Sequence, residues 1–190
     1  MQSAKINMFC HQRPLFVYVL LLFQCNLSIY GKFEQTIARF QQITPCMIFL
    51  KKNIKLKHLW SKSPKTYLGL MIPNFPNLFI IQGPGSPSVL TNVPVQIEQH
   101  VEWITNCLNF LNKKNKKTIE PTISSAKRWN AEIKKLADAS LFMKAKISWY
   151  KGDNIPGKPK VFIPYPGGLP RYRNICNKVE KNQYKEFLIK

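Results

Sequence analysis

The sequence predicts an α/β fold, and three segments carry this prediction. A continuous apolar run at residues 78–81 stands between Pro76 and Gly83, which is typical of a short strand buried on both faces. A turn rich in glycine and proline follows it and leads into an amphipathic helix. A second long helical pattern covers residues 121–140, and an extended C-terminal segment follows.

Composition favours a folded domain without disulfides or metal. The chain has 190 residues, of which 45% are hydrophobic, and this is enough apolar surface for a core. Its five cysteines are odd in number and widely spaced, with no C-x-x-C pair. This pattern argues against a disulfide framework and a zinc site, so a reducing, cytoplasmic location is the expectation.

The charge balance raises a rival function. A formal net charge of +20 is compatible with a basic module that binds nucleic acid or an anionic membrane, through residues 51–57, residues 113–117 and a loop around Trp149. Most of the excess is lysine beside asparagine and isoleucine, not an arginine-rich stripe. A solvated face is therefore the preferred interpretation, and nucleic acid is the less favoured partner.

Residues 1–57 have no assignment. Within them, residues 15–23 form an apolar run that is too short to span a bilayer comfortably but resembles the core of a signal peptide. A strand or short helix is as well supported as membrane association or targeting. Residues 58–190 form the second predicted region.

The turn at residues 83–88 reads GPGSPS, and it is predicted to let backbone approach a ligand closely. It matches the first two glycines of G-x-G-x-x-G but has Ser88 at the last position. No second strand ending in an acidic residue follows at the usual distance. We therefore reject a dinucleotide-binding fingerprint here.

A helix is predicted to start after Thr91 or Asn92, either of which can cap it, and to end near Asn112. Its apolar stripe is predicted to comprise Ile97, Val101, Ile104, Leu108 and Leu111. The free N–H groups at its start suit phosphate or an electron-rich carbonyl, although an ordinary strand-turn-helix connection has the same pattern. His100 is read as a packed histidine, not a catalytic base.

The remaining elements are read from simpler patterns. In the helix at residues 121–140, Trp129 is expected to anchor the core. Residues 148–160 contain glycine, proline and lysine between aromatics and are predicted to be a loop. A strand at residues 161–163 and a short helix after the paired glycines at 167–168 complete the expected order.

Four motifs together resemble the Baeyer–Villiger flavin monooxygenases: FPNLF-x-x-x-GPGSPS, N-x-x-x-x-IEQHVEW, SWY-x-G-x-NIPGKP and GG-x-x-RYR-x-IC. The resemblance covers residues 58–190. It implies the C-terminal fragment of a flavoprotein with two dinucleotide-binding domains. It also implies an enzyme that uses FAD and NADPH to convert a small-molecule ketone to an ester or lactone.

The resemblance also implies site residues. The Val93 backbone, with Asn92 beside it, would contact FAD, and Ser88, Val89 and Leu90 would line the substrate pocket. Trp149 would contact NADP from a mobile loop, with Asn154 and Lys158 as weaker candidates. The resemblance supplies no catalytic side chain and no metal ligand in this chain.

Several family motifs are absent from the sequence, namely the two dinucleotide-binding glycine motifs and F-x-G-x-x-x-H-x-x-x-W between them. The resemblance therefore implies a truncated chain that is inactive alone, unless a separate chain supplies the missing domains. A non-functional gene remnant has the same sequence features. Without its neighbours, the strand at residues 78–81 is expected to expose a sheet edge.

Overall fold

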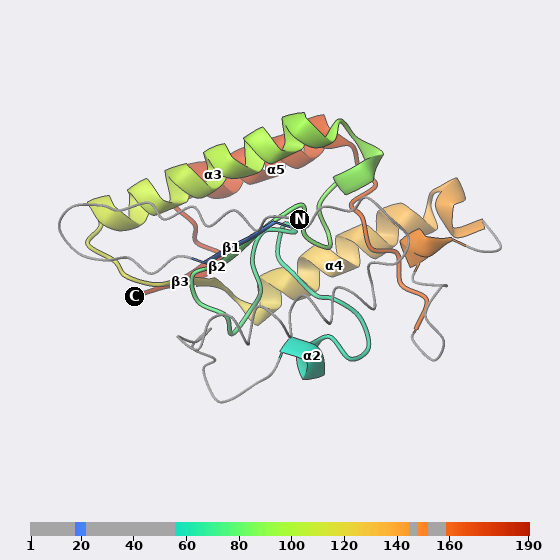
Figure 1. Ribbon diagram of the computed structural model, residues 1–190, viewed down its shortest axis with the longest axis horizontal. Helices are drawn as coiled ribbons and strands as arrows, with labels where there is room; N and C mark the ends of the chain where they lie inside the picture. The colour runs from blue at the N-terminus through green and yellow to red at the C-terminus, as the bar shows by residue number, and fades with distance from the viewer. Residues whose placement is uncertain (1–17, 22–55, 145–147, 152–158) are drawn as a thin grey trace.

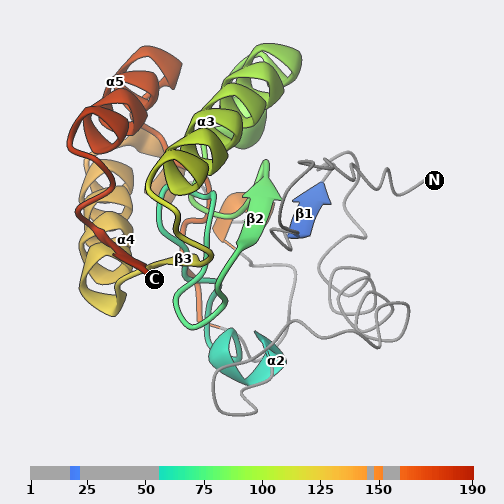
Figure 2. The same ribbon diagram turned by 90° about the vertical axis from the view of Figure 1, so that its left-hand side faces the viewer.

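The computed structural model describes residues 18–21, 56–144, 148–151 and 159–190. In chain order, its elements are β1 (Tyr18–Leu21), α2 (Leu56–Leu59), β2 (Leu78–Ile81), η1 (Ser88–Leu90), α3 (Val93–Lys113), β3 (Ile119–Pro121), α4 (Ile123–Asp138), η2 (Leu141–Lys144), η3 (Trp149–Lys151), α5 (Leu169–Lys181) and β4 (Phe187–Ile189). Helices α3 and α5 lie side by side in both views, and α4 and β2 lie on two different sides of this helix pair (Figures 1 and 2). The fold is mixed, with helices dominating over small sheets.

The predicted strand at 78–81 is present as β2, and all four of its residues are buried. β1 pairs with it in parallel, from Tyr18 opposite Leu78 to Leu21 opposite Ile81. Part of the N-terminal apolar run is therefore a strand, while residues 1–17 and 22–55 lie outside the described chain.

The second edge of β2 is also occupied. The Ile80 N–H donates to the Leu70 carbonyl at 2.7 Å, and Met71 forms an antiparallel bridge with Phe79. The expectation of an exposed sheet edge at residues 78–81 is therefore wrong, because the chain itself supplies neighbours on both sides.

Helix α3 starts as the sequence predicts but buries a different face. Asn92 is the N-cap, its side chain accepts from the Val95 N–H, and the helix ends at Lys113. Of the predicted stripe, Ile104 and Leu111 are buried, whereas Val101 is 40% exposed. The buried set is Gln96, Gln99, His100, Trp103, Ile104, Cys107 and Leu111. His100 can occupy this face because it finds hydrogen-bond partners on the elements packed against it.

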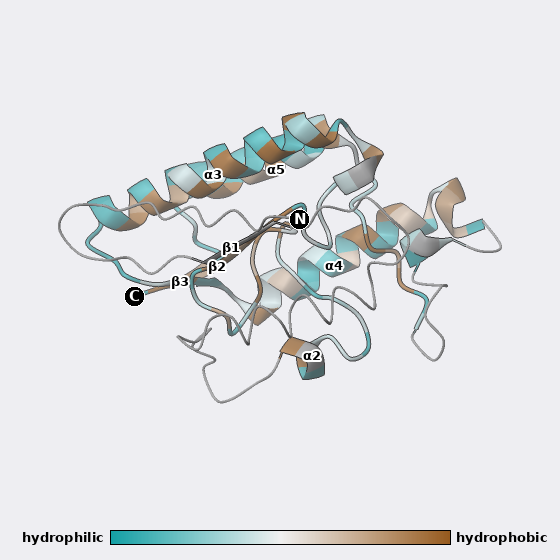
Figure 3. Cartoon of the chain, in the orientation of Figure 1, coloured by the Kyte–Doolittle hydropathy of each residue, from teal (hydrophilic) through white to brown (hydrophobic). Residues whose placement is uncertain are grey.

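Helices α4 and α5 were both predicted. Thr122 caps α4 by accepting from the Ser125 N–H, and the residues on its buried face include Trp129. Figure 3 shows hydrophilic residues along the outer faces of the long helices. The short antiparallel pair β3–β4, which the sequence reading missed, joins the start of α4 to the C-terminus.

The strand expected at residues 161–163 is absent, and this prediction is wrong. The segment runs without regular pairing, although Val161 donates to the Lys151 carbonyl and Ile163 donates to the Tyr150 carbonyl. These bonds join it to a single turn of 3₁₀ helix, so no strand ladder forms.

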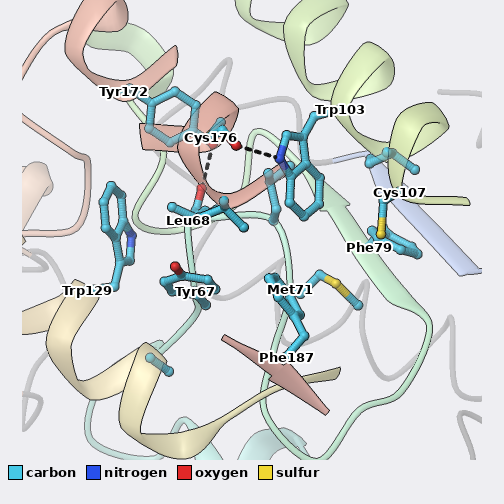
Figure 4. Packing of buried hydrophobic residues seen from close by; sticks show 14 of the residues in the cluster. Tyr67, Leu68, Met71, Phe79, Trp103, Cys107, Trp129, Tyr172, Cys176 and Phe187 are labelled. Atoms are coloured by element: carbon cyan, nitrogen blue, oxygen red, sulfur yellow. Dashed lines mark hydrogen bonds between the residues drawn. The ribbon is translucent and has the colours of Figure 1, made fainter. Parts of the chain in front are cut away.

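Aromatic side chains dominate the core between α3, α4 and α5 (Figure 4). The Trp103 indole N–H donates to the Cys176 carbonyl at 3.2 Å, which ties α3 to α5. Cys107 and Cys176 are buried free thiols. Among the described helices, none has the length and apolarity needed to cross a membrane.

Candidate cofactor-binding loop

The loop between β2 and α3 is bonded to several other elements through its carbonyls. The Thr66 hydroxyl donates to the Pro84 carbonyl, and the Trp129 indole N–H donates to the Gly85 carbonyl at 3.1 Å. The Ser86 carbonyl accepts from the Tyr165 N–H at 2.8 Å. The loop therefore has fixed contacts to α4, to the segment before α5 and to the turn before β2.

Hydrogen-bond donors of the same loop, both backbone N–H groups and side chains, are also paired. The Gly85 N–H donates to the Ile163 carbonyl at 2.9 Å, and the Ser86 hydroxyl donates to the Gly83 carbonyl at 2.7 Å. At the start of the loop, the Gln82 N–H donates to His100 Nδ1 on α3, and the Gln82 side chain donates to the Val93 carbonyl. The start of the loop is therefore attached to α3 at two points.

The glycines of this loop serve protein packing. A Cβ on Gly83 would lie 2.3 Å from the Gly69 carbonyl oxygen, and one on Gly85 would lie 3.0 Å from the Thr66 hydroxyl. A Cβ on Gly69 would in turn lie 2.4 Å from the Ser86 backbone nitrogen. The absent side chains make room for a second loop of the same chain.

The first turn of α3 leaves one amide free. Pro94 has no N–H, the Val95 N–H is capped by the Asn92 side chain, and the Gln96 N–H donates to the Asn92 carbonyl. Within the described residues, the Val93 N–H has no acceptor. Val93 is half-buried and Asn92 is exposed, so this donor stands at the positive end of the helix dipole near the surface.

The residues expected to line the substrate pocket lie just before α3 in the chain. Ser88 has a φ of 51° and is 2% exposed, and Leu90 is half-buried against the core. Val89 is part of the same 3₁₀ turn, η1. The structure thus places Ser88, Leu90, Asn92 and Val93 on one continuous segment.

Trp149 lies in η3, and the structure connects this turn to the loop in two steps. Tyr150 accepts from the Ile163 N–H, and the Ile163 carbonyl accepts from the Gly85 N–H. The position of the Trp149 side chain, and all of Asn154 and Lys158, lie outside the described structure.

His100 has more polar contacts than a packed histidine needs. Its Nε2 lies 2.9 Å from the Tyr172 hydroxyl and 3.3 Å from Gln96 Nε2, while Nδ1 accepts from Gln82. Burial lowers the pKa of His100 to about 3, so the ring is neutral at ordinary pH. The four-residue spacing of Gln96 and His100, which places them on one face of the helix, can be read from the sequence. The hydrogen bonds of His100 to Gln82 and Tyr172 cannot be read from it.

A groove of about 290 Å³ lies elsewhere, between α3 and α5. Its lining comprises Gln99, Glu102, Trp103, Asn106, Arg173, Asn177 and Glu180. The expected contact residues do not border it. Among the residues described, no cluster of histidine, cysteine, aspartate and glutamate could hold a metal ion.

Comparison with known proteins identifies relatives over most of the chain, although no family model matches it. Cyclohexanone 1,2-monooxygenase from an Acinetobacter species is 35% identical over 137 residues, which is 72% of this chain and 25% of the relative. A Baeyer–Villiger monooxygenase from Pseudooceanicola batsensis is 36% identical over 136 residues, 72% of this chain and 24% of the relative. Phenazine N-monooxygenase PhzNO1 of Lysobacter antibioticus is 36% identical over 134 residues, 70% of this chain and 24% of the relative.

Solved structures agree with these relatives. Cyclohexanone monooxygenase from Rhodococcus sp. Phi1 bound to NADP+ superposes with a TM-score of 0.69 at 35% identity, covering 74% of this chain and 26% of that chain. Oxidized steroid monooxygenase bound to NADP gives a TM-score of 0.67 at 39% identity, covering 73% and 25%. The chain thus spans about a quarter of the length of the relatives it matches. Over that shared part, it is homologous to the Baeyer–Villiger monooxygenases, with cyclohexanone monooxygenase among its relatives.

Proposed function

We propose that residues 58–190 form one wall of the FAD site of a Baeyer–Villiger type monooxygenase, as the C-terminal part of a flavoprotein with two dinucleotide-binding domains. The observation that carries the proposal is the Val93 N–H at the start of α3, which has no acceptor in the described part of the chain and follows a loop hydrogen-bonded to several elements. A fixed amide at a helix N-terminus is suited to an electron-rich carbonyl of a flavin ring. Homology to enzymes of this family supports the assignment.

Each part of the segment has a task in this proposal. The Val93 N–H donates to the flavin, and the exposed Asn92 side chain keeps the helix start in shape by capping Val95. Ser88, Val89 and Leu90 stand on the substrate side. Trp149 contacts NADP from a separate turn, and the bound cofactors supply oxygen activation and reducing equivalents.

The preferred substrate is a small ketone, which gives an ester or lactone. Length of homology alone does not fix this choice, because phenazine N-monooxygenase matches over nearly the same number of residues as cyclohexanone monooxygenase. Oxygenation of a ring nitrogen is therefore the second candidate reaction. Parallel assays with cyclohexanone and with phenazine would separate the two.

We also propose that this polypeptide alone neither binds FAD tightly nor turns over. It spans about a quarter of its relatives, so the two dinucleotide-binding glycine motifs must come from a separate chain or from further sequence. A chain with no such partner would be a non-functional remnant.

Complementation tests the proposal. The chain would be co-expressed with the part of Acinetobacter cyclohexanone monooxygenase that it does not match, and the purified complex would be examined for flavin absorbance. Bound FAD in the complex, and none in the chain alone, is the expected result. Stoichiometric flavin on the chain alone, or a stable complex without flavin, would contradict the proposal.

Val93→Pro sharpens this test because it removes the amide hydrogen, together with exchanging the isopropyl group for the proline ring. Proline is favoured in the first turn of a helix, and the extended conformation of Asn92 is compatible with a following proline. Loss of one hydrogen bond to the flavin is worth about 1–2 kcal/mol, so FAD affinity of the complex should fall roughly tenfold. Val93→Ala keeps the N–H and should bind FAD like the parent chain.

A further inference from the structure

A directed series of hydrogen bonds passes through His100. The Gln82 N–H donates to Nδ1 at 3.2 Å, so Nδ1 must be the unprotonated nitrogen. In the neutral ring Nε2 then carries the hydrogen, and it faces the Tyr172 hydroxyl at 2.9 Å. Tyr172 donates in turn to the Leu68 carbonyl at 2.6 Å (Figure 4). The Gln82 N–H only gives a hydrogen, His100 and Tyr172 each give one and receive one, and the Leu68 carbonyl only receives, so the direction of the series is fixed.

The same assignment settles the orientation of Gln96. Its Nε2 stands 3.3 Å from His100 Nε2, which would place two donors face to face, while its Oε1 is buried without a partner among the described residues. Rotating the amide by half a turn places Oε1 beside the Nε2–H group. Oxygen and nitrogen of an amide are exchanged in this way on hydrogen-bond grounds. The clash of donors is then removed and Oε1 gains a partner, while the amide nitrogen takes the position that Oε1 had.

The series joins the two loops that pack on each other. Gln82 has a φ of 61° and begins the loop after β2, and Leu68 has a φ of 58° and is fully buried in the opposite turn. Left-handed backbone at such residues is strained and persists only where the surroundings hold it. The two loops meet where Gly69 touches Ser86, so a shift at either end of the series would move this contact.

We propose that His100, fixed as the Nε2–H tautomer, is a positioning residue that holds residues 82–90 against α3 and α5. Its functional meaning rests on the proposed flavin site, because the same loop leads to Ser88, Leu90 and Val93. Simple core packing would need a ring of this size at position 100 but no particular tautomer. The surrounding groups favour the assignment, since Tyr172 and Cys176 on α5 both have a raised pKa through burial and stay protonated beside the ring.

Nitrogen NMR of the His100 ring in the full chain is the first test. The expected spectrum shows hydrogen on Nε2, none on Nδ1, and no titration between pH 5 and pH 8. A ring with hydrogen on Nδ1, or one that titrates in that range, would overturn the proposal.

Tyr172→Phe and Tyr184→Phe form a matched pair for the positioning role. Both hydroxyls are buried, but that of Tyr184 has no hydrogen-bond partner among the described residues. We expect Tyr172→Phe to speed amide exchange of residues 82–90 at least tenfold, with little change in α4. Tyr184→Phe should leave the loop as it is. Equal loop exchange in the two variants would refute the positioning role.

Substitutions of His100 itself test whether a side chain with the same hydrogen-bonding groups preserves the loop. His100→Gln keeps one acceptor and one donor, whereas His100→Leu keeps neither. Loop exchange should therefore rise in the order parent chain, His100→Gln, His100→Leu, and equal loop protection in the two variants would contradict the proposal. These readouts need no flavin. If they succeed while complementation yields no bound FAD, the proposed function fails and the positioning role stands.

Discussion

Two segments with expected cofactor contacts differ in how they are held. The loop at residues 82–90 is buried through Ser88 and is hydrogen-bonded to α3, α4, Thr66 and residues 163–165. Residues 141–144 and 148–151 are held by contacts among the rings of Phe142, Tyr150 and Phe162, and by backbone bonds from residues 161 and 163 to residues 151 and 150. Leu141 is 76% exposed there.

The difference matches two kinds of work. A wall that presents one amide to a flavin must already be in place, and many directional bonds achieve this. A segment expected to close over NADP must move, and few buried contacts leave its opening free energy low. The predictions below test this contrast between the fixed loop and the aromatic segment.

The largest effect is expected from Gly69→Ala, at the contact between the two loops. The new Cβ would lie 2.4 Å from the Ser86 nitrogen, in addition to the strain of a φ of 68°. We expect a loss of about 3–4 kcal/mol in the free energy of unfolding, measured by urea denaturation. Gly168→Ala is the control, because its φ of 78° is similar but its nearest neighbour is 3.9 Å away. That change should cost only about 1 kcal/mol, and equal losses would contradict the packing role of Gly69.

The next effect concerns pH. His100 has a pKa of about 3 in the folded chain and an ordinary value of 6.5 when unfolded, so the unfolded state binds the extra proton between these values. Stability is therefore full above pH 6.5 and falls as the pH drops toward 3, by about 3 kcal/mol between pH 7 and pH 4. Unfolding of His100→Gln over the same range gives the comparison. Parallel curves for the two proteins would show that His100 contributes nothing to the pH dependence.

A smaller effect compares aromatic residues of the two segments. Trp129→Phe removes the bond to the Gly85 carbonyl and leaves that buried acceptor unpaired, which should cost about 1–3 kcal/mol. Phe142→Leu, at a ring that is 38% exposed, should cost less than about 1 kcal/mol. Thermal unfolding of both variants would test the contrast, and a larger loss at Phe142 would reverse it.

Sequence was a good guide where local chemistry decides. Asn92 and Thr122 are short polar residues that precede an apolar helical pattern, and both cap their helices. Leu78–Ile81 is a continuous apolar run and forms a buried strand. It failed where tertiary partners decide. His100 is accommodated on the buried face of α3 because Gln82 and Tyr172, distant from it in sequence, complete its hydrogen bonds.

The candidate site shows the same division. The free Val93 amide follows from a capped helix start with Pro94, which is readable from sequence. The role of the loop glycines is not readable, because the groups that fill the space beside them come from distant residues: the Gly69 backbone beside Gly83, and the Thr66 and Trp129 side chains beside Gly85. A glycine-rich turn predicts close approach of something, and only the fold identifies it as the protein itself.

Hydrogen exchange of the unliganded full chain tests most directly whether the loop is a preformed wall. The account predicts that amides of Gly85 and Ser86 exchange at least tenfold more slowly than those of Tyr150, Lys151 and Val161. Equal exchange, or faster exchange in the loop, would contradict it, because the loop would then need a cofactor to take its shape.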